Sequence, residues 1–266
     1  MASALTLNEL MQGSRLQGRI IGALMLREMR TRFGEYRLGY AWALLEPLAQ
    51  IGIMSTMFYL LGSRPPLGTS FEAFFFTGFV SFSFFRDLAQ KGMSAISANR
   101  PLLSFPPVRN MDAVWARLAL ELITHLTSLF FVMVILGYLG VPIMPADPLK
   151  FAEGYLSIIV LGIGFGIFNA TFSPLFKVWS ILFSWFARVQ FFISGVFFLP
   201  ERLPPAALDY LRWNPTTHSL AYVREGFYGT YQSNILVEAY PFLVGIVLAL
   251  VGLTLERVYR KQVSPR

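Results

Sequence analysis

Long apolar runs, separated by polar or proline-rich segments, dominate the amino-acid sequence. A helix needs about 20 mostly apolar residues to cross the hydrocarbon core of a bilayer. The second run is short, and we expect it to extend toward Leu88 while Arg86 reaches back to the interface. The pattern predicts an all-α membrane protein with six transmembrane helices, at residues 40–62, 71–85, 113–139, 155–172, 178–199 and 239–255.

Lysine and arginine are distributed unevenly among the predicted connections. They are dense before the first run, between the second and third runs and after the last run. Cytoplasmic segments of membrane proteins are enriched in these residues, so both termini are predicted to be cytoplasmic. The chain thus divides into a cytoplasmic N-terminus at 1–39, a six-helix transmembrane domain at 40–256 and a cytoplasmic tail at 257–266.

The N-terminal segment has the pattern of a basic amphipathic helix. Leu16, Ile20 and Leu24 recur at helical spacing, while Arg15, Arg19 and Glu28 are expected elsewhere around the helix. Such a helix lies in the membrane interface with its apolar face toward the acyl chains. An ordinary soluble helix packed on a partner protein is the alternative interpretation.

Two predicted connections have unusual compositions. Residues 86–112 mix helix formers with Pro101, Pro106 and Pro107, which suits either a short docking helix for a cytoplasmic partner or a solvated loop. Residues 200–234 are too apolar for a free loop and are cut by prolines into pieces too short to cross the membrane. They predict one or two short re-entrant or periplasmic helices that are buried against protein.

Composition supports the membrane interpretation and removes several classes of function. Hydrophobic residues make up 55% of the chain and charged residues only 14%, too few to cover a soluble core of this size. Cysteine is absent, and no Gly-Lys-Ser/Thr phosphate loop occurs, so the chain is not expected to hydrolyse ATP itself. The net charge of +7 suits a membrane surface better than nucleic acid. His125 and His218 lack ligand spacing with any carboxylate cluster, so no metal site is expected.

Several polar residues fall inside the predicted spans. Arg117, Glu121 and His125 follow one another in steps of four, which places them on one face of the third span. Ionisable groups in a membrane face protein or water, so this face could line a substrate path. An Arg117–Glu121 pair that only holds neighbouring helices together is the favoured alternative. Glu46, which lies beside Pro47 in the first span, could line a cavity or a helix contact.

Aromatic residues form a stripe at helical spacing along and just before the fifth span. The stripe could offer stacking surfaces to sugar rings, although lipid contact or packing is the commoner role of such residues. Its members are Phe172, Phe176, Trp179, Phe183 and Phe186.

Three motifs carry a resemblance to a known family. Residues 26–48 read LREMRTRFGEYRLGYAWALLEPL, residues 94–107 read SAISANRPLLSFPP, and Trp213-Asn214-Pro215 precedes the last span. Together they resemble the permeases of polysaccharide-exporting ABC transporters, with capsular polysaccharide exporters first and O-antigen exporters next. The likeness covers the whole chain, and the first motif is the most specific of the three.

The resemblance implies a homodimeric, non-enzymatic permease in the bacterial inner membrane. It implies two copies of a separate cytoplasmic ATPase that holds ATP and Mg²⁺, a periplasmic co-polymerase or adaptor, an outer-membrane conduit and a lipid-linked anionic polysaccharide. In that family the first and fifth spans line the path. The residues it assigns to the path or its entrance are Arg27, Arg30, Arg32, Arg37, Trp42, Glu46, Trp179, Phe183 and Phe186. Those it assigns to ATPase coupling are Lys91, Ser94, Asn99 and Arg100.

Other functions remain open at the level of sequence. A teichoic-acid-type glycan exporter or a drug or small-lipid exporter would share the same architecture. A membrane-embedded transferase would need an acid–base pair near an interface, and only Glu121 with His125 approaches one. An ion-coupled transporter would show an inverted repeat or a pair of broken helices, and neither is evident.

Overall fold

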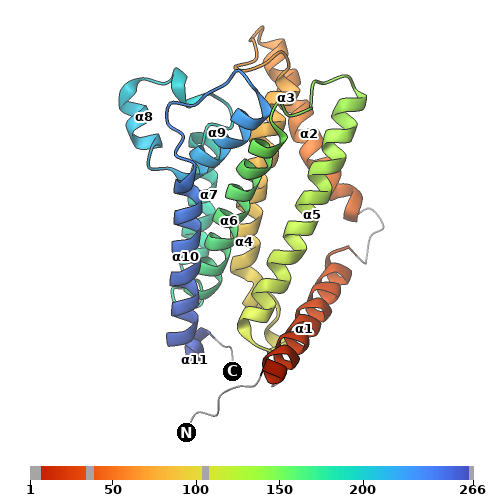
Figure 1. The fold of residues 1–266 in the computed structure, drawn as a ribbon, viewed down its shortest axis with the longest axis vertical. Coiled ribbons are helices and arrows are strands. Elements are labelled where there is room, and N and C mark those ends of the chain that lie inside the picture. The colour runs from red at the N-terminus through yellow and green to blue at the C-terminus, as the bar shows by residue number, and fades with distance from the viewer. Residues whose placement is uncertain (1–6, 34–38, 104–107, 264–266) are drawn as a thin grey trace.

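The computed structural model describes residues 7–33, 39–103 and 108–263. The regular elements in these ranges are helices, as the sequence predicts. Figure 1 shows α8 and α9 gathered at one end of the molecule, with α11 and the beginning of α1 at the other. The elements are α1 (Leu7–Phe33), α2 (Gly39–Leu60), α3 (Phe71–Phe75), η1 (Phe76–Val80), α4 (Ser81–Ala98), η2 (Arg100–Leu102), α5 (Asn110–Tyr138), α6 (Pro148–Phe172), α7 (Trp179–Ile193), η3 (Pro200–Arg202), α8 (Pro205–Leu211), α9 (Pro215–Phe227), α10 (Ala239–Val258) and α11 (Arg260–Val263).

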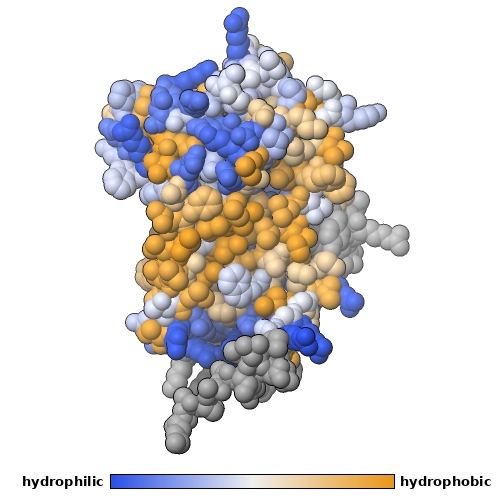
Figure 2. All heavy atoms as spheres, viewed as in Figure 1, coloured by the Kyte–Doolittle hydropathy of each residue, from blue (hydrophilic) through white to orange (hydrophobic). Residues whose placement is uncertain are grey.

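Four helices within the described ranges are long and apolar enough to cross a membrane. They account for the first, third, fourth and sixth predicted spans. Figure 2 shows an apolar belt around the middle of the visible face and hydrophilic residues toward both ends, as expected for a bilayer-embedded protein. The four helical segments are Ala41–Leu60, Asn110–Tyr138, Pro148–Phe172 and Ala239–Val258.

The second predicted span ends too early. Helical structure runs from α3 through the π-helical turn η1 into α4, and α4 continues to Ala98 rather than stopping near Leu88. Leu88, Ala89 and Ala95 extend the buried face beyond the first charged residues. Arg86 forms an ion pair with Asp87 within α4, and the helix continues past both residues. Arg86 therefore does not mark the end of the helix. Lys91 and Ser94 therefore belong to the long helix and not to a separate short one.

The fifth predicted span is shorter than expected. Helix α7 ends at Ile193, and Gly195 follows with φ of 84°, a left-handed conformation that ends helices and favours glycine. The chain from 194 to 199 is not helical. The fourth span is longer than predicted, because α6 begins at Pro148 and not at Tyr155. Asp147 caps this beginning by accepting hydrogen bonds from the backbone N–H groups of Leu149 and Lys150.

Helix α6 lies at the centre of the bundle and packs against α4, α9 and α10. Glycines permit these close approaches, because small residues let helix backbones come near one another. Gly162 and Gly166 face Leu88 of α4, whereas Gly164 faces Gly245 of α10. Small residues thus bring two helices close to α6 on different faces.

We expect Gly164→Ala to destabilise the bundle. A Cβ atom at this position would lie 2.1 Å from the carbonyl oxygen of Gly245, so α6 and α10 would have to separate. Overpacking of this kind costs about 1–3 kcal/mol. Gly52→Ala in α2 is the matched control, because nothing lies within 4 Å of its new methyl group. The apparent melting temperature in detergent should fall for the first variant only, and equal values would contradict the packing.

The segment between α7 and α10 forms a compact cap, and the predicted short helices are present as α8 and α9. Every residue of α9 from Thr216 to Phe227 is buried. Arg224 is only 1% exposed. Its Nη1 donates to the carbonyl oxygen of Gly195 at 2.6 Å, and its Nη2 donates to that of Val196 at 3.1 Å. The guanidinium therefore fixes the chain that follows α7.

Candidate functional site

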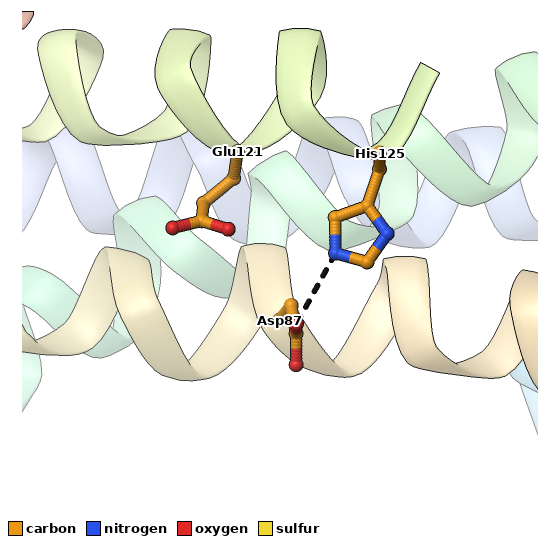
Figure 3. A group of neighbouring side chains, drawn as sticks. All are labelled: Asp87, Glu121 and His125. Atoms are coloured by element: carbon orange, nitrogen blue, oxygen red, sulfur yellow. Dashed lines mark hydrogen bonds and ion pairs between the residues drawn. The ribbon is translucent and has the colours of Figure 1, made fainter. Parts of the chain in front are cut away.

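Charged and polar side chains of α4 and α5 lie close together in the space between these two helices (Figure 3). Asp87 on α4 lies 3.1 Å from Nε2 of His125 on α5. The same carboxylate accepts a hydrogen bond from Nζ of Lys91 at 3.2 Å and another from Nε of Arg86 at 3.0 Å. The ring of His125 also stacks on Phe84, with 4.8 Å between ring centroids. The carboxylate of Asp87 therefore contacts three basic side chains.

Glu121 continues the network along α5. Its side chain is 0% exposed, and its carboxylate lies 3.0 Å from Nζ of Lys91 and 3.8 Å from Nε of Arg117. Arg117 also pairs with Glu28 of α1. Acidic and basic groups thus alternate from α1 through α5 to α4. A buried charge is tolerated when it is paired in this way.

The pairing of Arg117 corrects two expectations. Glu28 does not fall on a separate side of α1, because it is buried on the same face as Leu24. Arg117 is not restricted to its intrahelical partner, and its closer contact is across to α1. Burial raises the pKa of the Glu28 carboxyl above its ordinary value, and the charge of Arg117 acts in the opposite direction.

Three of these side chains could in principle ligate a metal ion. The ligand atoms of Asp87, Glu121 and His125 lie within 4.8 Å of one another. The sequence argument against a metal relied on the absence of a carboxylate cluster at ligand spacing from His125. That reason is wrong, because Asp87 of α4 joins Glu121 beside the ring. The ammonium of Lys91, however, already bridges both carboxylates. The expectation that the chain holds no metal stays a prediction.

A polar cavity of about 60 Å³ lies between this network and α2. Glu46 and Gln50 line it from α2, and Thr124, His125 and Ser128 line it from α5. The structure thereby brings together Glu46, Lys91 and His125, which the sequence argument placed in three separate groups. The side-chain hydroxyl of Ser128 donates to the carbonyl oxygen of Ala43, which links α5 to α2 beside the cavity.

Comparison with known proteins now identifies the family. A sequence model described as ABC-2 type transporter matches residues 19–228, which is most of the chain. The chain belongs to this family. Membership confirms the resemblance found in the motifs and implies a partner ATPase.

Relatives of this ABC-2 permease are proteins of polysaccharide export. It is 31% identical over 249 residues to the polysialic acid transport protein KpsM of Escherichia coli, covering 92% of this chain and 95% of the relative. It is 30% identical over 260 residues to the capsule polysaccharide export inner-membrane protein CtrC of Neisseria meningitidis serogroup B, covering 94% and 95%. The corresponding protein BexB of Haemophilus influenzae is 27% identical over 257 residues, covering 96% of both chains.

The aromatic residues assigned to the path of the permease have different surroundings. Trp42 on α2 is exposed, and Phe186 on α7 is also exposed. Phe183 is only 2% exposed and packs against Phe165 of α6. The indole N–H of Trp179 donates to Oδ1 of Asn169 at 2.9 Å. Within one chain, Phe183 and Trp179 therefore connect α7 to α6, and Phe186 also stacks on Phe165 while part of its ring stays exposed. Trp42 faces outward.

The basic residues near the end of α1 are only partly described. Nη1 of Arg27 donates to Oδ1 of Asn99 at 3.1 Å, which ties α1 to the end of α4. Arg30 is exposed. Arg37 and the side chain of Arg32 lie outside the described residues.

The predicted coupling residues separate into two groups. Lys91 belongs to the charged network, and Ser94 donates to the carbonyl oxygen of Lys91. Asn99 is buried at the end of α4, where its amide donates to the carbonyl oxygen of Ala95. Arg100 lies at the same end and lines a cleft of about 310 Å³ with Lys177.

Asp87 and Glu28 are the members of the network that sequence reasoning missed. Asp87 precedes Lys91 by four residues, a spacing that supports an ion pair on one helix face and could have indicated it. Glu28 follows Leu24 by four residues, which places both on one face of a helix. No feature of the sequence indicates that Arg117 is the partner of Glu28, because that contact depends on how α1 crosses α5.

Proposed function

We propose that this permease forms the transmembrane path of an ATP-driven exporter of lipid-linked capsular polysaccharide in the bacterial inner membrane. The observation that carries the proposal is its likeness to KpsM and CtrC over nearly the whole length of each chain. The chain acts as a channel-forming subunit and not as an enzyme. ATP and Mg²⁺ are bound by the partner ATPase, and both termini of the permease are cytoplasmic.

Six crossings are part of this proposal. The continuous helical stretch of α3, η1 and α4 serves as the second crossing. Helix α7 serves as the fifth, although its 15 residues cover only about 22 Å at 1.5 Å per residue. The non-helical chain from 194 to 199 completes that crossing. Arg224 donates to the carbonyl oxygens of Gly195 and Val196, which helps to satisfy a non-helical segment at membrane depth.

The end of α4 is our candidate for the ATPase contact. Arg100 and Lys177 bring positive charge to a cleft that Met93, Ile96 and Val263 line with apolar atoms. Movement of this end would pull on α1 through the Arg27–Asn99 hydrogen bond. It would also reach α5 through the charged network of Lys91 and Glu121. This arrangement offers a physical route from an ATPase to the polar cavity beside α2.

The remaining partners follow from the same proposal. Two permeases pair so that the outward faces of α2 and α7 meet across a central path, with Trp42, Glu46 and Phe186 available to the glycan. Two ATPase subunits bind the cytoplasmic side, and a periplasmic adaptor and an outer-membrane conduit receive the product. Arg27 and Arg30 lie where cations could attract the phosphate of a lipid-linked substrate.

The test is complementation of a capsule-export mutant that lacks its own permease and ATPase. We expect surface polysaccharide to appear when this permease is expressed together with its partner ATPase. It should disappear when the phosphate-loop lysine of the ATPase is replaced, with the permease still present in the membrane. Export that persists without ATP hydrolysis, or glycosyl transfer by the purified permease alone, would exclude the proposal.

A further inference from the structure

A shallow cleft of about 460 Å³ opens at the end of the molecule where α8, α9 and α10 meet. This end is opposite the beginning of α1 (Figure 1), and hydrophilic residues predominate there on the face shown in Figure 2. The cleft contains two aromatic residues and an acidic and a basic group. Its lining residues are Asp209, Arg212, Trp213, His218, Val237 and Tyr240.

The backbone that forms this cleft is held firmly. Nε2 of His218 donates to the carbonyl oxygen of Arg212 at 2.9 Å, and Nδ1 accepts from the backbone N–H of Val237 at 3.0 Å. These two roles fix the neutral tautomer of His218, and burial lowers its pKa in agreement. The hydroxyl of Tyr240 donates to the carbonyl oxygen of Trp213 at 2.9 Å. Both carbonyl groups flanking the cleft are therefore anchored.

Trp213 is the part of the Trp213-Asn214-Pro215 motif that packing does not explain. Asn214 caps α9 by accepting from the backbone N–H of Thr216, and its amide donates to Oε1 of Gln190 on α7. Pro215 begins α9, where its missing N–H costs nothing. The side chain of Trp213, by contrast, is 78% exposed. Because the backbone of Trp213 is fixed and its indole lines the cleft, the ring offers a preformed flat surface to a ligand.

The polar groups beside the indole narrow the class of ligand. Nη1 of Arg212 lies 3.5 Å from Oδ1 of Asp209, and both side chains are exposed. A guanidinium can bind a carboxylate through two parallel hydrogen bonds, and an aspartate can accept hydrogen bonds from vicinal hydroxyl groups. The flat indole face suits the C–H face of a sugar ring. An anchor for the lipid interface would need the indole but not an ionised pair beside it.

We propose that this cleft is a binding site for one carboxylated sugar unit of an anionic glycan, with Trp213 as the stacking platform and Arg212 as the carboxylate ligand. The site is a specificity-determining contact at the exit side and rests on the proposed export function. Asp209 and Tyr240 complete it as hydroxyl partners. His218 holds the backbone and makes no charged contact with the ligand.

Fluorine NMR on the full-length permease, labelled with 5-fluorotryptophan and reconstituted in lipid nanodiscs, tests the site. The resonance of Trp213 is assigned by its loss in Trp213→Phe, because the chain contains five tryptophans. Trigalacturonic acid is the acidic probe and maltotriose is the neutral one. We expect a saturable shift of this resonance with the acidic trimer, at a dissociation constant on the order of 1 mM. The neutral trimer should bind at least fivefold more weakly.

Arg212→Gln should weaken binding of the acidic trimer at least fivefold and leave binding of maltotriose unchanged. Arg202→Gln is the matched control, because this exposed arginine lies outside the cleft and donates to the carbonyl oxygen of Pro66. It should leave both affinities unchanged. The spectra of the other four tryptophans report whether either variant is folded.

Three results would overturn the site. The first is that neither sugar shifts the Trp213 resonance, and the second is that Arg212→Gln does not alter the shift. The third is that the resonance responds only to a spin-labelled lipid, which would make Trp213 a membrane anchor. Complementation with the unaltered chain separates this failure from failure of the proposed function. If export continues although the cleft binds no sugar, only the proposed site is excluded. If the unaltered chain supports no export, the proposed function is excluded.

Discussion

Arg224→Met should destabilise the protein by roughly 3–5 kcal/mol, because buried carbonyl groups that lose their donor each cost about 1–3 kcal/mol. Arg224 donates to the carbonyl oxygens of Gly195 and Val196, and at a longer 3.3 Å to that of Phe198. Its guanidinium also lies 4.3 Å from the ring centroid of Phe74. Methionine fills much of the volume but donates no hydrogen bond. The apparent melting temperature in detergent should fall by about 10 °C.

Two further variants separate hydrogen bonding from charge. Arg224→Lys keeps the charge but lacks the planar guanidinium that reaches three carbonyl groups at once. Its melting temperature should therefore lie between those of the unaltered protein and Arg224→Met. Arg202→Met removes an exposed arginine that donates to a single carbonyl oxygen, that of Pro66 at 2.7 Å. Its loss should cost no more than about 1 kcal/mol. If Arg224→Met were as stable as Arg202→Met, the hydrogen bonds from Arg224 to the segment after α7 would contribute little to stability.

The long helices could be predicted because membrane insertion is decided by local sequence. The apolar runs that became α2, α5, α6 and α10 satisfy a length requirement that no tertiary contact has to supply. Helix α9 could also be anticipated, since Asn214 and Pro215 form a favourable beginning for a helix. Helix boundaries were less accurate where a charge was taken to mark the membrane surface. Arg86 and Asp87 pair with each other within α4, so the helix continues past them.

The candidate site could be predicted only in part. Arg117, Glu121 and His125 were found because their spacing places them on one helix face. Their partners could not be found, since Glu28 and Asp87 reach them from other helices and depend on how those helices cross. The aromatic stripe shows the same limit of an argument from spacing, and its proposed contact with sugar rings stays a prediction. Phe172 and Phe176 precede α7, and Phe183 packs on α6, so a regular spacing does not correspond to one exposed face.

Glu121→Leu is the substitution in the charged network with the largest expected effect. The Glu121 carboxylate is fully buried between Lys91 and Arg117. Removing it leaves two largely buried cations with one acidic partner each, and breaking a buried pair costs about 3–5 kcal/mol. We expect a fall in melting temperature comparable with that of Arg224→Met. Glu46→Gln is the control, because Glu46 is an exposed neighbour of the same cavity whose amide partner is Gln50 at 3.5 Å.

The double variant Lys91→Met/Glu121→Leu should recover at least half of the stability that Glu121→Leu loses. Asp87 would retain Arg86 and His125, and Arg117 would retain Glu28, so the remaining charges stay paired. A buried ion pair can often be replaced by apolar residues without loss, whereas one partner alone cannot be removed cheaply. Stability measured for both single variants and the double variant gives the coupling energy. Additive losses would show that Lys91 and Glu121 act independently, and a stable double variant that no longer exports would assign the pair to transport rather than to folding.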